Sequence, residues 1–194
     1  MNRFESYDDT NKYTQSSENL KCIVLESRLQ DECISLNNCI VRINLNLNKV
    51  NHAKLSNLYL ESLDVDTFQA FNNLSSINLS FNRIKQLDKS VFTGLERKLI
   101  EIDISRNNHL KKLISFEDFK NLSILNLSFI QISVVEKDTF RGLANLKVLH
   151  LSHNYSLTKL ELNVFEGLFK LVELDLSFNE LNEIDVNLFK GKLI

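Results

Sequence analysis

The chain repeats one pattern of apolar and polar positions, and the most complete copy lies at residues 171–184. There the sequence LVELDLSFNELNEI places leucine at the first, fourth and sixth positions and asparagine at the ninth. The fourth and sixth positions alternate with a polar residue, which predicts a short β-strand that turns its apolar side chains to one face. The asparagine follows this strand and predicts a loop whose backbone groups bond to the amide.

The pattern recurs along residues 40–194, with a period of about 24 residues from Leu74 onward and shorter first copies. We identify about seven copies, which begin at Ile40, Leu55, Leu74, Leu99, Leu122, Leu146 and Leu171, and the last copy has no terminal cap. Each copy leaves an apolar face that only a neighbouring copy can bury. The pattern therefore predicts an α/β fold. We expect a right-handed superhelical solenoid with a curved parallel β-sheet on its concave face and short helical turns or irregular structure on its convex side.

Two further positions predict how the turns are held together. The asparagines should form a ladder of buried amides, interrupted at Leu63 and Ile130 where apolar residues replace them. Phenylalanines on the return half of each copy should stack and fill the convex half of the core, next to brief turns at 88–92, 136–140 and 163–165. The ladder residues are Asn48, Asn82, Asn107, Asn154 and Asn179, and the equivalent phenylalanines are Phe92, Phe140, Phe165 and Phe189.

Two segments precede the repeats. Residues 1–19 are polar and without hydrophobic periodicity, so we expect a disordered segment, and they contain no secretory signal. Residues 20–39 contain all the cysteines and predict a cap that closes the first turn of the solenoid. We expect a disulfide between Cys22 and Cys33 in an oxidising compartment, and three reduced, buried cysteines are the alternative. Three roles stay open for Cys39: a buried thiol, the partner of Cys22 in place of Cys33, or a bridge to another molecule.

The repeat resembles the extracellular leucine-rich-repeat class found in Toll and Toll-like receptors, Slit-type guidance proteins and the secreted leucine-rich immune proteins of insects. The resemblance rests on LxxLxLSFNxIxxLxxxxFxGL within residues 40–194 and on the cap segment LKCIVLESRLQDECISL, which looks most like the insect immune and Toll-related group. The usual cap of this class carries four cysteines, whereas this chain has three. The resemblance implies recognition of another protein outside the cell, in innate immunity, adhesion or developmental signalling.

The concave face is the expected binding surface, because solenoids present one broad surface on the strand side. Phe81, Phe129 and Phe178 are also typical of packing over a strand edge, and the acidic side chains are also typical of plain solvated charge. The candidate protein-binding residues are Tyr59, Asn78, Phe81, Glu101, Asp103, Arg106, Asn126, Phe129, His150, His153, Glu173, Asp175 and Phe178.

Composition and motifs argue against several other functions. The 25 acidic and 23 basic residues give no basic excess for nucleic acid, and no apolar run approaches the roughly 20 residues of a membrane span. No nucleophile with its base, no phosphate-binding loop and no C-x-x-C occurs, so we expect no enzyme activity, cofactor or metal. His150 beside Asp175, with His153 nearby, comes closest to a metal or pH-sensitive site, but ordinary polar side chains on an exposed strand account for it as well.

Five sequons occur, and geometry separates them. Asn73 and Asn121 precede strands and are the expected glycosylation sites, whereas the ladder residue Asn154 should be buried. A glycan on Asn78 or Asn126 would obstruct the concave face. We expect an extracellular protein, either secreted or the ectodomain of a longer one, with a cytoplasmic adaptor as the alternative. A third alternative is a homo-oligomer that pairs through the open edge of the last repeat.

Overall fold

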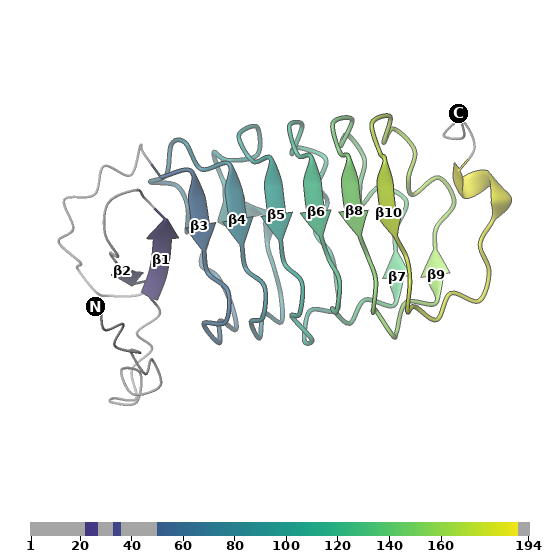
Figure 1. The fold of residues 1–194 in the computed structure, drawn as a ribbon, viewed down its shortest axis with the longest axis horizontal. Coiled ribbons are helices and arrows are strands. Elements are labelled where there is room, and N and C mark those ends of the chain that lie inside the picture. The colour runs from purple at the N-terminus through teal and green to yellow at the C-terminus, as the bar shows by residue number, and fades with distance from the viewer. Residues whose placement is uncertain (1–21, 27–32, 36–49, 190–194) are drawn as a thin grey trace, which may run out of the picture.

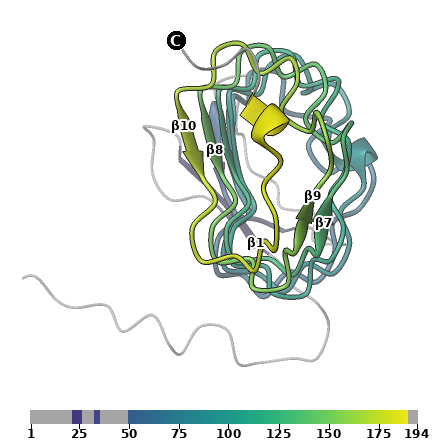
Figure 2. The same cartoon turned by 90° about the vertical axis from the view of Figure 1, so that its right-hand side faces the viewer.

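The computed structural model describes residues 22–26, 33–35 and 50–189. The chain coils into a solenoid whose turns lie side by side along one axis, as predicted (Figure 1). Each turn passes along one wall as a strand and returns along the opposite wall (Figure 2). Leucine, isoleucine and phenylalanine side chains from both walls form one buried core. Within these described ranges, no helix is long and apolar enough to cross a bilayer.

The strand wall is an eight-stranded sheet in the order β10-β8-β6-β5-β4-β3-β1-β2. Its members from β3 to β10 are parallel, three residues long, and in register between successive turns. The central residue of each points inward and the two beside it point outward, because side chains alternate along a strand. The parallel strands are β3 (His52–Lys54), β4 (Ser76–Asn78), β5 (Glu101–Asp103), β6 (Ile124–Asn126), β8 (Val148–His150) and β10 (Glu173–Asp175).

The second repeat begins five residues earlier than predicted. The register pairs Ala53 with Ile77, so the repeat starts at Val50 and not at Leu55. Ala53 occupies the central strand position, where the other repeats have leucine or isoleucine. Leu55, Leu58 and Leu60 follow at the spacing with which a repeat begins, so the sequence pattern indicated a start at Leu55. Val50 and Ala53 are both buried, at 0% and 1% exposure, which confirms that they belong to the core.

This shift corrects two residue predictions. Leu58, and not Leu63, takes the place of the ladder asparagine, because its N–H donates to Asn82 Oδ1 of the next turn at 3.0 Å. Tyr59, which the predicted frame set between two inward apolar residues of a strand, lies instead in the loop beyond β3. Lys54 holds that place instead, opposite Asn78.

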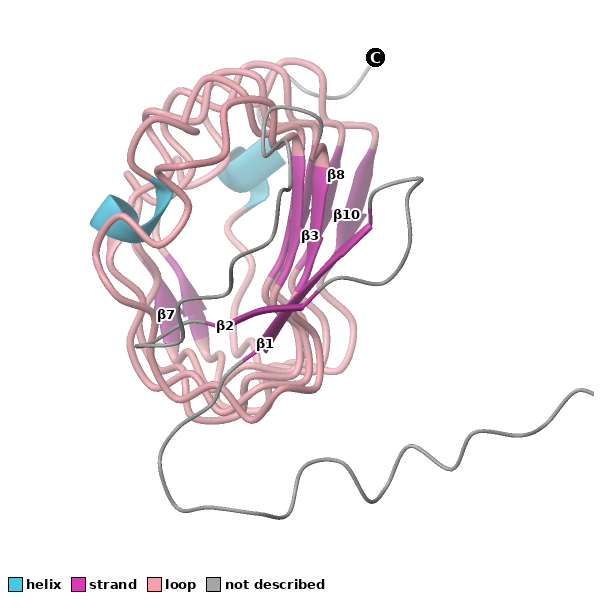
Figure 3. Ribbon diagram, turned by 90° about the vertical axis from the view of Figure 1, so that its left-hand side faces the viewer, coloured by secondary structure: helices cyan, strands magenta, loops and turns pink. Residues whose placement is uncertain are grey.

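Two antiparallel strands precede β3 (Figure 3). β1 (Cys22–Glu26) pairs with β3 on one side and with β2 (Cys33–Ser35) on the other, so β1 covers the sheet edge of the first described turn. The register sets Cys22 opposite Ser35 and Cys33 opposite Val24. The Cys22–Cys33 disulfide stays a prediction, and Cys39, Asn48, the repeat beginning at Ile40 and residues 1–19 lie outside the described residues.

The return wall contains little regular structure, as expected. A 3-10 helix, η3 (Lys89–Phe92), follows Asp88, whose Oδ1 accepts the Ser90 N–H at 2.8 Å. A second, η4 (Val186–Phe189), lies in the last described turn, and β7 (Val134–Val135) pairs with β9 (Lys159–Leu160) in a two-stranded parallel sheet. The predicted turn at 88–92 is η3, and the predicted turns at 136–140 and 163–165 are present as non-helical turns, whereas β7, β9 and η4 were not predicted.

Phenylalanine rings run through the convex half of the core, which confirms their predicted packing. Neighbouring ring centroids lie 5.5 to 6.3 Å apart, within the range of favourable aromatic contacts. The rings are Phe68, Phe92, Phe119, Phe116, Phe140, Phe165 and Phe189 in order along the solenoid.

The asparagine ladder is also confirmed. Asn107 Nδ2 donates to the Ile104 carbonyl of its own turn at 2.8 Å and to the Leu79 carbonyl of the preceding turn at 3.0 Å. Its Oδ1 accepts the Ile84 N–H at 3.0 Å. Each amide thus satisfies buried backbone groups of two turns at once. Asn82, Asn154 and Asn179 repeat this arrangement.

Candidate protein-binding face

The parallel register aligns the outward residues of successive strands into two columns on the concave face. The first residues of the strands form the outer column and the third residues form the inner column. The outer column contains Ser76, Glu101, Ile124, Val148 and Glu173, and the inner column contains Asn78, Asp103, Asn126, His150 and Asp175. The outward side chains therefore lie in line from β4 to β10.

The centre of the outer column is apolar. Ile124 lies beside Val148 on the next strand, and Ile124 is 37% exposed. Glu101 borders this pair on one side, where its Oε2 accepts a hydrogen bond from the Ser76 hydroxyl at 3.2 Å, and Glu173 borders it on the other. The face thus presents an apolar patch between two carboxylates.

The inner column is held rigid by its own backbone. Four of its side chains accept, through Oδ1, the N–H of the serine two residues later, at 2.9 to 3.1 Å. These bonds fix each side chain at the end of its strand. The bonded pairs are Asn78 with Ser80, Asp103 with Ser105, Asn126 with Ser128, and Asp175 with Ser177.

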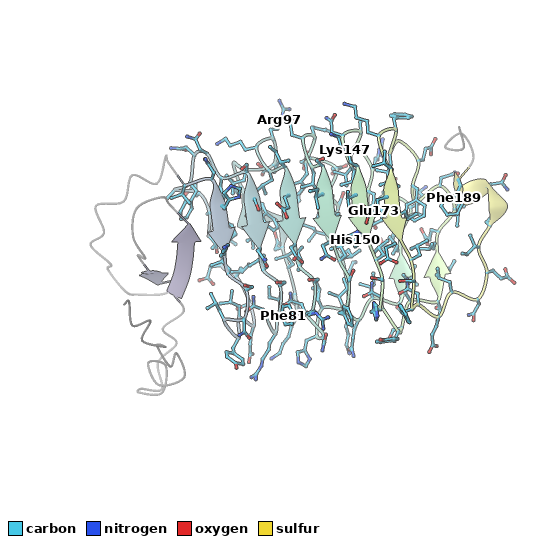
Figure 4. All side chains as sticks on the ribbon, in the orientation of Figure 1. Phe81, Arg97, Lys147, His150, Glu173 and Phe189 are labelled. Atoms are coloured by element: carbon cyan, nitrogen blue, oxygen red, sulfur yellow. The ribbon has the colours of Figure 1, made fainter. Side chains whose placement is uncertain are left out.

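His150 lies between Asn126 and Asp175 across the strands, as predicted, but its side-chain hydrogen bond is to Glu173 and not to Asp175. Its Nε2 lies 2.7 Å from Glu173 Oε1 on the neighbouring strand (Figure 4). Asp175 is engaged elsewhere: hydrogen bonds from the hydroxyl and N–H of Ser177 and from the Ser152 hydroxyl, together with the nearby His150, hold the pKa of its carboxyl below the ordinary value. Across the part of the chain that the structure describes, no group of three histidine, cysteine or acidic side chains could hold a metal ion.

A stack of alternating aromatic and basic side chains borders the concave face where the strands end. Its members precede the ladder position of successive turns, and each has a positive φ of 55 to 58°, an uncommon conformation that turns all the side chains the same way. The guanidinium Cζ of Arg106 lies 4.8 Å and 3.9 Å from the ring centres of Phe81 and Phe129. His153 lies 4.1 Å from Phe129 and 4.3 Å from Phe178, centroid to centroid.

This stack, Phe81–Arg106–Phe129–His153–Phe178, confirms that the aromatic residues pack over the strand edge. Nδ1 of His153 is buried without a hydrogen-bond partner among the described residues, so its ring contributes by packing. Phe81 and Phe178 stay 55% and 65% exposed, so the stack also presents an aromatic rim to solvent. Tyr59 lies outside it and packs against Arg83, whose Cζ is 4.8 Å from its ring centre.

The sequon asparagines lie as expected. Asn73 and Asn121 are exposed before their strands, and the Asn121 side chain donates to the Arg97 carbonyl at 2.6 Å. Asn154 is 0% exposed. Glycosylation of Asn73 and Asn121 stays a prediction.

Comparison with known proteins agrees with this architecture. The family model for the leucine rich repeat matches residues 72–131 and 120–181, which together span more than half of the chain. No curated protein matches the chain.

Three solved structures share the fold. TLR13, in its complex with ssRNA13, is 33% identical over 69% of this chain and 19% of its own, with a TM-score of 0.64. The Leptospira interrogans LRR protein LIC12759 is 26% identical over 70% of this chain and 33% of its own, with a TM-score of 0.61. The matching chain of the mouse RP105/MD-1 complex is 27% identical over 62% of this chain and 20% of its own, with a TM-score of 0.53.

The chain therefore spans a third or less of each of these three structures. The likeness to TLR13 and RP105 supports the Toll-like resemblance of the repeat, and the family match covers most of the described turns. The chain belongs to the leucine-rich-repeat family.

Proposed function

We propose that this chain is a recognition module that binds another protein on its concave face. The observation that carries the proposal is the apolar pair Ile124 and Val148, held between Glu101 and Glu173 on adjoining strands. Apolar centres with polar borders are typical of protein interfaces. A rigid sheet also loses little conformational freedom on binding, which favours affinity.

The charge of the face indicates the chemistry of the partner. Two acidic pairs flank the apolar centre, Glu101 with Asp103 and Glu173 with Asp175, and they come from strands on either side of it. Complementary charge accelerates association and fixes register. The preferred partner segment therefore presents an apolar side chain with lysine or arginine on both sides.

A displayed library of random peptides tests this function directly. We expect the natural chain to enrich peptides with an apolar residue between basic ones, and we expect Ile124→Glu to abolish the enrichment. Leu162→Glu is the matched control, because Leu162 is an exposed apolar residue at 51% in the turn after β9 on the return wall. Equal enrichment by both variants would remove the concave face as the binding surface.

We place this module outside the cell, in innate immunity or cell-surface signalling. The cap cysteines support this location, and so does the likeness to TLR13 and RP105. An intracellular adaptor is the rival. Thiol labelling of the native protein separates the two, since a disulfide-bonded cap gains reactive thiols only after reduction. Three thiols that react freely without a reductant would contradict the extracellular location.

Self-association is a second candidate function. β10 is the outermost parallel strand of the described sheet, and Phe169 and Val172 beside it are 84% and 81% exposed. Exposed apolar side chains at a sheet edge favour pairing with another chain. Sedimentation velocity would show a dimer that Val172→Glu dissociates, whereas a monomer at high concentration would remove this candidate.

A further inference from the structure

The fold assembles a row of cations that are far apart in the sequence. The row lies at the edge where the strands begin, and we call it the basic edge. Segments 96–98, 119–121, 144–147 and 169–172 precede or enter four successive strands and together contain five cations and one carboxylate, the half-buried Glu96. The five cations are all exposed and are Arg97, Lys98, Lys120, Lys147 and Lys170.

Hydrogen bonds join these segments into one continuous edge. The Asn121 amide donates to the Arg97 carbonyl at 2.6 Å, and the Asn145 amide donates to the Lys120 carbonyl at 2.8 Å. Lys170 Nζ then donates to Asn145 Oδ1 at 2.7 Å. Adjacent segments are therefore about one strand spacing, ~4.8 Å, apart. Figure 4 shows Arg97 and Lys147 at this edge and Phe81 at the opposite one.

The charge of the basic edge is not neutralised within the described part of the chain. The ion pairs found there join Lys85 with Glu61, Lys89 with Asp118 and His150 with Glu173, so none involves the row. The partner of Lys170 is a neutral amide. The whole chain has a formal charge of -2 and its concave face carries four carboxylates, whereas these four segments carry five cations and one carboxylate, so the edge has a local excess of positive charge.

We propose that the basic edge binds a linear sulfated polysaccharide that lies along the solenoid axis. Cations in a line, open to solvent, match a polymer that carries anions at intervals along its length. Stacking of nucleic-acid bases needs successive aromatic platforms. On these segments Phe119 is buried and Phe169 is exposed, so the edge offers one such platform. Phe169 and Val172 also lie at one end of the row and not along it, which disfavours a membrane surface.

Heparin is the probe that tests this proposal. The edge variant combines Arg97→Gln, Lys98→Gln and Lys120→Gln, and the control combines Lys111→Gln, Lys112→Gln and Lys159→Gln, which removes the same charge from exposed sites elsewhere. Both carry Ser123→Ala, because a glycan on Asn121 would crowd Lys120. Circular dichroism and melting temperature check that each variant is folded.

We expect the edge variant to bind heparin about tenfold more weakly than the control and with a shallower dependence of affinity on salt, since fewer counterions are released. Desulfated heparin should bind weakly to both proteins. Equal losses in the two variants, or no binding at physiological salt, would overturn the proposal. It would also be overturned if a single-stranded oligonucleotide or phosphatidylserine vesicles bound the edge more tightly than heparin.

Discussion

Asn107 is the ladder residue whose removal most directly tests how neighbouring turns are joined. It is 0% exposed and bonds to backbone groups of its own turn and of the preceding one. The next turn already has Ile130 in the ladder position, although the Ile130 N–H is satisfied by Asn154. Asn107→Ala would therefore leave two adjacent turns without a ladder amide.

The cost follows from the backbone groups that lose their partner. The Leu79 carbonyl keeps its bond from Asn82 Nδ2 at 2.9 Å, but the Ile84 N–H and the Ile104 carbonyl lose the amide of Asn107. A buried polar group without a partner costs about 1–3 kcal/mol, so the free energy of unfolding should fall by about 2–6 kcal/mol. This is a large part of the roughly 5–15 kcal/mol that stabilises a typical domain.

Urea unfolding followed by circular dichroism measures this loss. Asn108→Ala is the matched control, because Asn108 is the exposed neighbour of Asn107 and should change the free energy by no more than about 0.5 kcal/mol. A broader transition in Asn107→Ala would show that the two halves of the array unfold separately. If the two variants had the same stability, the ladder would not join the turns.

Three further predictions concern the core, the stack and the inner column. Phe140→Ala should lower the free energy of unfolding by about 3–5 kcal/mol, because Phe140 is fully buried between two rings. Phe169→Ala, at an exposed ring, should change it little, and thermal unfolding compares the two variants. Arg106→Ala removes two cation–ring contacts and should lower the free energy of unfolding by about 1–2 kcal/mol in a denaturant titration. Arg97→Ala is the control, and equal losses in the two variants would refute a stabilising stack. The lowered pKa of Asp175 stabilises the fold above the ordinary Asp pKa, near 3.9, and this contribution disappears as the pH falls through the lower folded pKa. Stability in acid should therefore depend less on pH in Asp175→Asn, and a carboxyl NMR titration at the ordinary value would contradict the shift.

The solenoid, the strands from β4 onward and the ladder were predictable because each depends on a residue type that recurs at a fixed spacing. An asparagine after a strand and two leucines separated by one residue indicate this fold when they return several times along the chain. The packing of the buried phenylalanines in the convex half of the core was predictable for the same reason. These features repeat, so a single irregular copy does not hide them.

The second repeat was misplaced because its signal is degenerate. Ala53 occupies the central strand position without looking like a leucine, and Leu55, Leu58 and Leu60 reproduce the spacing of a repeat start. The spacing alone cannot tell the two frames apart. The pairing of β3 with β4 settles the frame, and with it the positions of Lys54 and Tyr59.

Features that depend on side-chain direction lay beyond the sequence pattern. His150 hydrogen-bonds to Glu173, although Asp175 is its partner in the strand register. Packing of the aromatic residues over the strand edge was predictable, but the contacts of Arg106 and His153 with those rings depend on a positive φ that the residue types do not indicate. The basic edge was not predictable from the sequence, because its cations are scattered along the chain and lie side by side only when the turns stack.

Photo-crosslinking from the concave face tests the proposed function most directly. A photoreactive residue replaces Val148 in one protein and Leu162, on the return wall, in another, and each is irradiated with a basic peptide selected by the natural chain. We predict a single covalent adduct from position 148 and none from position 162. An adduct from position 162, or equal yields from both, would contradict recognition by the concave face.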